Sequence, residues 1–99
     1  SLRYLMKIVK ANSFIKKFKG LMFKNNINYG MFFSNTNKIH TFFMKECIDI
    51  YGLDNNYDVK DIYLNVKPWK IVFLKNSKHA LEIPSNSNYK YSKNEKVRF

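Results

Sequence analysis

Short stretches in which apolar and polar residues alternate, or in which apolar residues run together, recur along this chain between turn residues, which is the pattern of β-strands. We therefore expect short strands at these positions: 3–9, 30–33, 39–44, 47–54, 59–66, 71–74, 79–83 and a closing edge strand at 96–99. The segment 71–74 fits either a strand or an extended cover over the core. Inside 59–66, the alternation predicts that Ile62, Leu64 and Val66 point inward.

One stretch follows the helical period instead. Phe14, Phe18 and Leu21 recur at spacings near 3.6 residues, with lysines between them. Asn12 or Ser13 can accept a hydrogen bond from a free backbone N–H at the start of a helix. The pattern predicts a short amphipathic helix over 13–19.

Turn residues separate the expected strands, at 34–38, 54–56 and 76–78. Pro68 ends the strand before it, because proline cannot donate a hydrogen bond to a sheet. We predict a single small domain over residues 1–99, mainly β or α+β. Its antiparallel or mixed sheet would be curled and barrel-like, with one or two short helices.

The net charge of +11 suggests nucleic-acid binding, and the first 45 residues hold nine basic residues and no acid. A second explanation competes with this one. Lys, Asn, Ile, Phe and Tyr make up 54 of the 99 residues, and A/T-rich codons encode all five. Sixteen lysines against two arginines are typical of a solvated surface in an A/T-rich genome, since nucleic-acid readers favour arginine. Nucleic acid stays a secondary expectation.

A single cysteine, Cys47, excludes an internal disulfide and suits a reducing compartment. No apolar run is long enough for a membrane-spanning helix. Lys7 and Lys10 interrupt the first apolar patch, which makes it a poor signal peptide. These features predict a cytoplasmic protein. Export after removal of a leader stays open, because the sequence begins with Ser1.

Five segments occur in the order and spacing of one family. They read GLMFK, GMFF, FFMK, IDIYGLD and ALEIP, at residues 20–24, 30–33, 42–45, 48–54 and 80–84. Together they resemble the bacterial and archaeal family called domain of unknown function 192, over residues 11–99. The resemblance implies a small β-rich domain with one or two short helices and no established activity. Lys24 stands where the family usually has arginine, and Glu46-Cys47 where many members have Asn-Thr.

The segment 39–54 combines a dense apolar run with charged residues. Asp49 lies between Ile48 and Ile50, so its carboxylate must be paired or have a raised pKa. It could act as a general base or ligand anchor, or could pair structurally with Lys45, Lys24 or backbone N–H groups. Glu82, between Leu81 and Ile83, could join it in one cleft as an acid/base pair, or face water.

Methionines and paired phenylalanines recur beside this segment and form a second theme. They could line an apolar groove for a ligand or peptide, or simply fill the core. In a strand, paired phenylalanines place one ring on each face. Trp69, between Lys67 and Lys70, could cover the mouth of the barrel or be a stacking platform for single-stranded nucleic acid.

We therefore predict a non-enzymatic binding or accessory module rather than an enzyme. The expected ligand-binding residues share the central apolar segment and its neighbours: Lys24, Phe43, Met44, Lys45, Asp49 and Glu82. We expect no catalytic residues, metal or cofactor, because no motif for any of them is present. The expected partner is a small ligand or peptide, without a membrane span, and the oligomeric state is left open. The alternatives are an enzyme using Asp49 and Glu82, or a basic nucleic-acid-binding module.

Overall fold

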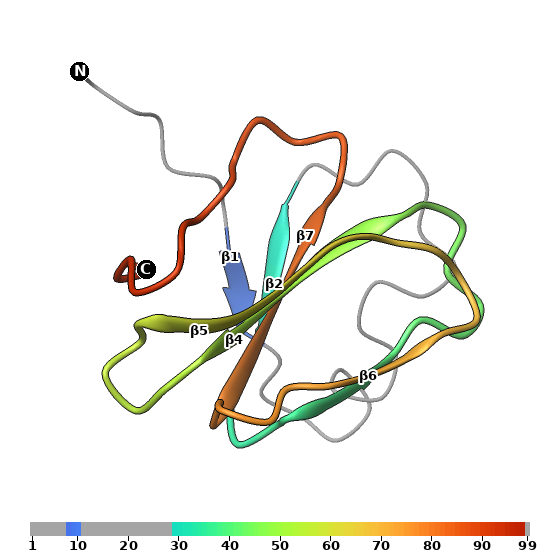
Figure 1. Ribbon diagram of the computed structural model, residues 1–99. Coiled ribbons are helices and arrows are strands. Elements are labelled where there is room, and N and C mark those ends of the chain that lie inside the picture. Colours follow the sequence, from blue (N-terminus) through green and yellow to red (C-terminus); the bar gives the residue numbers. More distant parts are fainter. Residues whose placement is uncertain (1–7, 11–28, 99) are drawn as a thin grey trace.

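The computed structural model describes residues 8–10 and 29–98. Within these residues the secondary structure consists of seven strands (Figure 1): β1 Ile8–Lys10, β2 Gly30–Phe33, β3 Lys38–His40, β4 Ile48–Leu53, β5 Val59–Val66, β6 Ile71–Phe73 and β7 His79–Pro84. No helix occurs in this part of the chain, and consequently none there is long and apolar enough to cross a membrane. The predicted helix over 13–19 lies outside the described residues.

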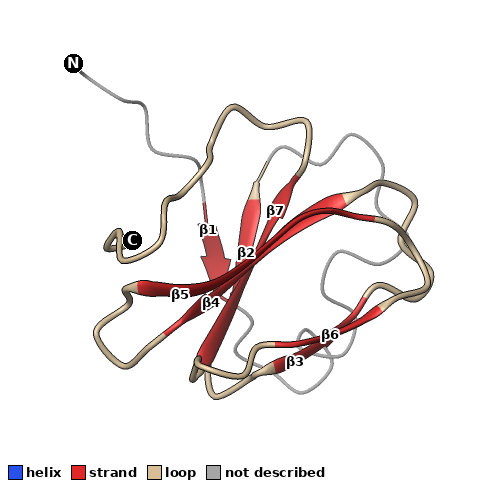
Figure 2. Ribbon diagram, viewed as in Figure 1, coloured by secondary structure: helices blue, strands red, loops and turns tan. Residues whose placement is uncertain are grey.

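The strands form two sheets (Figure 2). The larger sheet has the order β1-β2-β7-β4-β5, in which only β1 and β2 are parallel, and the smaller one pairs β3 with β6. The predicted β-rich domain is confirmed. The barrel is wrong, because β1 and β5 are separate edges of the larger sheet rather than neighbours.

Both faces of the larger sheet are covered. Its central strands β4 and β7 are therefore buried almost throughout, since each of their side chains meets one of two cores. The β3–β6 ribbon covers the first face, with Ile39 and Val72 pointing inward into a core that also contains Ile48 and Ile50. The C-terminal segment covers the second face, where Val97 packs among apolar side chains of the sheet. The predicted split of the paired phenylalanines is confirmed, because Phe33 lies in the first core and Phe32 in the second.

A bulge in β5 overturns one detail of the predicted alternation. Ile48 pairs with Val66 and Ile50 with Tyr63, so two residues of β5 lie opposite one residue of β4. One of the two, Leu64, is exposed rather than inward. Because of the extra residue, side chains after the bulge point to the opposite face from the one that simple alternation predicts. Ile62 and Val66 consequently pack against different cores.

Two predicted strands are shorter than expected. The strand predicted over 39–44 ends at His40, and the chain then forms a turn. Near the C-terminus only one isolated bridge, between Asp58 and Lys96, replaces the predicted closing strand. In both places the chain forms hydrogen bonds outside a strand pair. The alternation of apolar and polar residues in the sequence does not predict such bonds.

His79 at the start of β7 should make the domain sensitive to mild acid. Its Nδ1 accepts a hydrogen bond from the backbone N–H of Asn35 at 2.9 Å, which requires a neutral ring. Burial, helped by the charge of Lys78, lowers the pKa of His79 below its ordinary 6.5. The unfolded chain therefore takes up a proton first, and stability present above pH 6.5 is lost as the pH falls through the folded pKa.

We expect the free energy of unfolding, measured with urea, to decrease between pH 7 and pH 5. His79→Asn retains an acceptor near the position of Nδ1 but does not titrate, so part of this decrease should disappear in that variant. An identical pH dependence in the two proteins would contradict the assignment.

Candidate functional site

The outer face of the β3–β6 ribbon carries a ladder of outward-facing side chains, of which His40 and Phe42 are half-buried and the others exposed. Register places Lys38 opposite Phe73 and His40 opposite Ile71. A further rung follows, since the Phe42 ring stacks on Trp69 at 5.6 Å and contacts His40 at 4.9 Å. We call this surface the ladder face and define it by six residues: Lys38, His40, Phe42, Trp69, Ile71 and Phe73.

Large apolar side chains on the ladder face are unusually accessible. The exposed fractions are 60% for Trp69, 54% for Phe73 and 47% for Ile71, and Phe43 beside Trp69 is 47% exposed. Single exposed apolar residues are common, but contiguous ones mark interaction surfaces. Here they follow one another along one strand and its extension, so they form a continuous patch.

Buried Thr41 holds the two turns at the end of this ladder together. Its Oγ1 donates to the carbonyl of Lys67 at 2.7 Å and accepts from the N–H of Lys70 at 2.8 Å. Its backbone carbonyl also accepts from the N–H of Trp69 at 3.0 Å. One side chain therefore satisfies backbone groups of the 67–70 turn that no sheet pairs.

The two turns hold their aromatic residues in an unfavourable backbone conformation. Phe43 and Trp69 have φ angles of 62° and 68°, in the left-handed region that bulky residues rarely adopt. Such a backbone costs about 1–3 kcal/mol per residue and persists only where the surroundings enforce it. The Thr41 hydrogen bonds are contacts of this kind, and they fix the end of the ladder face.

Thr41→Val should weaken this end of the molecule. Valine has nearly the same shape but cannot bond the carbonyl of Lys67 or the N–H of Lys70, which leaves two part-buried backbone groups without this partner. We expect a loss of about 2–3 kcal/mol in the free energy of unfolding. Hydrogen exchange should accelerate at the amide of Lys70 more than at amides in β4. Thr41→Ser, which keeps the hydroxyl, is the matched control; an equal loss in both variants would contradict this role.

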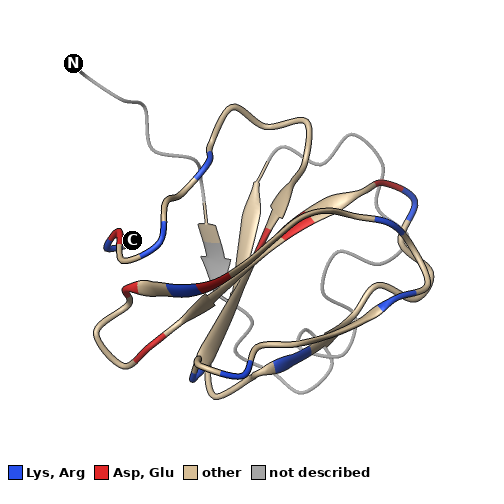
Figure 3. Cartoon of the chain, viewed as in Figure 1, with Lys and Arg blue, Asp and Glu red and all other residues tan. Residues whose placement is uncertain are grey.

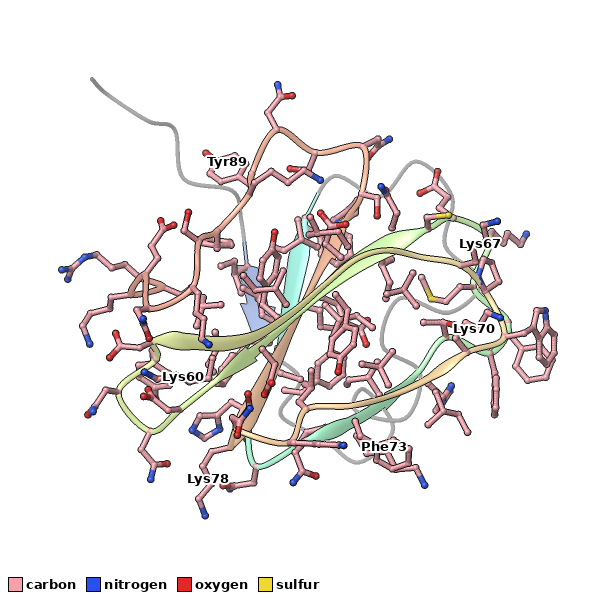
Figure 4. The ribbon with its side chains drawn as sticks, in the orientation of Figure 1. Lys60, Lys67, Lys70, Phe73, Lys78 and Tyr89 are labelled. Carbon is pink, nitrogen blue, oxygen red and sulfur yellow. The ribbon has the colours of Figure 1, made fainter. Side chains whose placement is uncertain are left out.

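The ladder face lies in a basic part of the surface. Residues 34–45 and 67–75, which carry it, contain five lysines and no acid: Lys38, Lys45, Lys67, Lys70 and Lys75. Among the described residues no carboxylate forms an ion pair with any of these lysines. Lys67 and Lys70 lie at one end of the molecule and Lys60 at the other (Figure 4). The β5–β6 connection correspondingly carries blue segments and no red one (Figure 3).

Asp49 occupies a different place, on the second face of the larger sheet. Its buried carboxylate accepts hydrogen bonds from the backbone N–H of Asn65 at 3.0 Å, Ser85 Oγ at 2.8 Å and Lys90 Nζ at 2.6 Å. Asn65 is the bulge residue of β5, with a φ of 53°. Asp49 thus joins β4, the bulge and the C-terminal segment. This geometry fits the structural reading, with Lys90 rather than Lys45 as the cation.

Asp49 and Glu82 do not share a cleft. In the β4–β7 register Asp49 is opposite Ile83 and Ile50 is opposite Glu82. Opposed residues point to the same face and consecutive residues to opposite faces, so the two carboxylates lie on different sides of the sheet. The alternative of an acid/base pair is therefore wrong.

The other predicted ligand-binding residues are also dispersed. Met44 is buried in the first core, Lys45 is exposed in the 41–47 turn, and Phe43 adjoins the ladder face. Lys24 lies outside the described residues. The six predicted residues therefore do not form one pocket, but Phe43 contacts Trp69 of the ladder face and Lys45 follows two residues later in the same turn.

A shallow pocket of about 280 Å³ lies near Asp49, lined by Glu46, Cys47, Asn65, Ser85 and Asn86. Its walls include the free thiol of Cys47. No group of three or more potential metal ligands occurs in the described part of the chain. The pocket offers no apolar wall comparable to the ladder face.

Sequence reasoning missed Thr41 and Lys90. Nothing in the local pattern marks either residue, because their partners are 26–29 and 41 positions away. The ladder face itself had a partial signal. Lys38, His40 and Phe42 alternate with Ile39 and Thr41, but Ile71 to Leu74 are all apolar, so which of them face outward is not readable.

Comparisons with known proteins agree on one family. The family model DUF192, described as "Uncharacterized ACR", matches residues 3–97. A UPF0127 protein of Pyrococcus horikoshii is 41% identical over 81 residues, covering 75% of this chain and 69% of the relative. One from Thermococcus sibiricus is 37% identical over 81 residues, covering 75% of this chain. The chain spans about half the length of that relative, 52%.

Two solved structures share the fold. A protein of unknown function from Novosphingobium aromaticivorans superposes with a TM-score of 0.70 at 20% identity, covering 80% of this chain and 63% of that one. A putative transcription regulator from Sinorhizobium meliloti gives 0.68 at 16% identity, covering 78% and 67%. At these identities the likeness establishes the fold alone.

Proposed function

The chain belongs to the DUF192 family, whose function is not known, and for this member we propose a non-enzymatic binding function carried out by the ladder face. The observation that carries the proposal is the row of exposed Trp69, Ile71 and Phe73, which lie on β6 and in the turn just before it. Soluble domains seldom leave such a continuous apolar row in water unless it contacts something.

The backbone supports the same proposal. Phe43 and Trp69 are exposed and have strained backbones, which lowers the stability of the domain, and the hydrogen bonds of buried Thr41 hold this end in place. Backbone strain of this kind is concentrated at functional sites. The proposal keeps Phe43 and Lys45 from the predicted ligand-binding residues as flanking contacts. Asp49 becomes a structural residue.

The lysines define the chemistry of the partner. Lys38 lies over the Phe73 ring, and Lys67 and Lys70 flank Trp69 in the chain. Segments 34–45 and 67–75 contain no acid, so the partner should be anionic. A small ligand in an enclosed pocket is less well supported, because the ladder face is an exposed sheet face.

Fluorescence can test the proposal directly, because Trp69 is the only tryptophan of the chain. We expect its emission to change when the protein is titrated with at least one of three anionic probes: phosphatidylglycerol vesicles, a single-stranded oligo-dT, or polyglutamate. Phe73→Ser should abolish the change. Leu64→Ser, an exposed leucine outside the ladder face, should leave it intact. If no probe alters the emission, or if both variants behave alike, the proposal fails.

A further inference from the structure

We infer that the anionic partner of the ladder face is a lipid surface, into which Trp69, Ile71 and Phe73 insert while the surrounding lysines contact lipid phosphates. This inference rests on the proposed function and specifies its partner. It concerns attachment to the membrane surface by exposed side chains of a small sheet.

The ring contacts favour lipid over single-stranded nucleic acid. Bases bind by stacking on open aromatic faces. Here the Phe42 ring contacts both His40 and Trp69, and the ammonium of Lys38 lies over the Phe73 ring at 5.6 Å. These contacts occupy part of the ring surface on which a base would stack. Insertion among lipids requires only apolar area, which the same rings still expose.

Ile71, between Trp69 and Phe73 on the ladder face, favours lipid for a second reason. Ile71 offers no ring for stacking, yet it is about half exposed between Trp69 and Phe73. A mixed row of aromatic and aliphatic side chains is what interfacial membrane anchors present. Tryptophan in particular prefers the depth of the lipid headgroups, because its ring is apolar and its N–H is polar.

The arrangement of charge completes the match. Lys38 lies within the ladder face, and Lys67 and Lys70 lie on either side of Trp69 in the chain. Their long stems can follow the apolar side chains inward while each ammonium stays at the level of the phosphates. Each lysine near an anionic surface strengthens binding, and the effect weakens with salt.

The test uses the full chain and vesicles of phosphatidylcholine with or without phosphatidylglycerol. With phosphatidylglycerol present, Trp69 emission should shift to the blue and be quenched by brominated acyl chains. Vesicles of phosphatidylcholine alone should produce much less of either effect. Because the wild-type protein gives this readout, the result does not depend on any variant folding.

Matched variants locate the contact. K38Q/K67Q/K70Q should weaken partitioning on the order of a hundredfold, from the contribution per lysine near a membrane. K60Q/K78Q/K93Q removes the same charge elsewhere and should change it far less; Lys60 lies at the far end of the molecule (Figure 4). Ile71→Ser should reduce quenching, and Leu64→Ser should not. Circular dichroism checks that each variant is folded.

Three outcomes would overturn the inference. If oligo-dT or polyglutamate binds in a manner that depends on the ladder face and vesicles do not, the lipid is wrong but the proposed binding function stands. If the two lysine triples weaken vesicle binding equally, the attraction is unspecific charge. If no probe depends on the ladder face, both proposals fail.

Discussion

Replacing Asp49 by alanine should be among the most destabilising single changes in this domain, with an expected loss of about 2–6 kcal/mol, which is about 1–3 kcal/mol for each of two buried donors left without an acceptor. The buried carboxylate accepts from Asn65 N–H, Ser85 Oγ and Lys90 Nζ, and alanine leaves the first two donors with no acceptor in place. Lys90 is about half exposed, so water can solvate its freed ammonium. The larger part of the loss therefore comes from the two neutral donors.

Urea unfolding would measure this effect, with Asp58→Ala as the matched control. Asp58 pairs with Lys96 at 3.4 Å near the surface, where an ion pair contributes about 1 kcal/mol or less. Since small domains are stable by only about 5–15 kcal/mol, Asp49→Ala could leave little folded protein. Asp49→Asn, which keeps an acceptor, should then retain measurable stability. Equal losses in the Asp49 and Asp58 alanine variants would contradict the structural role.

Tyr51→Ala should cost about 3–5 kcal/mol, because the ring is fully buried in the second core and packs edge-on against Tyr91 at 5.2 Å. Tyr51→Phe removes only the hydroxyl, which accepts from the N–H of Tyr91 at 3.3 Å, and should cost about 1 kcal/mol. Thermal and urea unfolding of the two variants separates packing from hydrogen bonding. A phenylalanine variant as unstable as the alanine variant would show that the hydroxyl dominates.

The same residue predicts how the domain responds to alkali. Burial raises the pKa of Tyr51 above its ordinary 10.0, since the phenolate would lose its hydration. Above pH 10 the unfolded chain therefore loses this proton first. The contribution of Tyr51 to stability is complete below pH 10 and is lost as the pH rises through the folded pKa. Tyr51→Phe should lose less stability between pH 9 and pH 11 than the wild-type protein.

The strands could largely be predicted from local pattern, and the reason is physical. β5 is partly exposed and shows a loose alternation of apolar and polar residues, whereas β2, β4 and β7 are covered on both faces and are visible as short, mostly apolar runs between turn residues. The predicted strand over 59–66 coincides with β5, since the turn residues at 54–56 precede it and Pro68 follows it. The predicted ends of the strands were less accurate where the chain bonds to a distant residue instead of a neighbouring strand. After His40, for example, Thr41 bonds the backbone of Lys67 and Lys70.

The candidate site was only partly predictable. Trp69 between two lysines was visible as an interleaving of aromatic and basic residues, and it lies on the ladder face. The sequence did not show that the Asp49 and Glu82 side chains point to opposite faces of the sheet. That direction depends on which residues of β4 and β7 lie opposite each other. That register puts one carboxylate in each core.

The sequence by itself determined that this is a basic, β-rich domain of the DUF192 family, because periodicity, charge and family segments are properties of consecutive residues. Only the tertiary structure decided that the sheet stays open, that Lys90 pairs with Asp49, and that Trp69, Ile71 and Phe73 share one exposed face. Each of these depends on contacts between residues distant in the chain. A uniformly apolar run such as Ile71 to Leu74 carries no mark of which side chains the fold will leave in water.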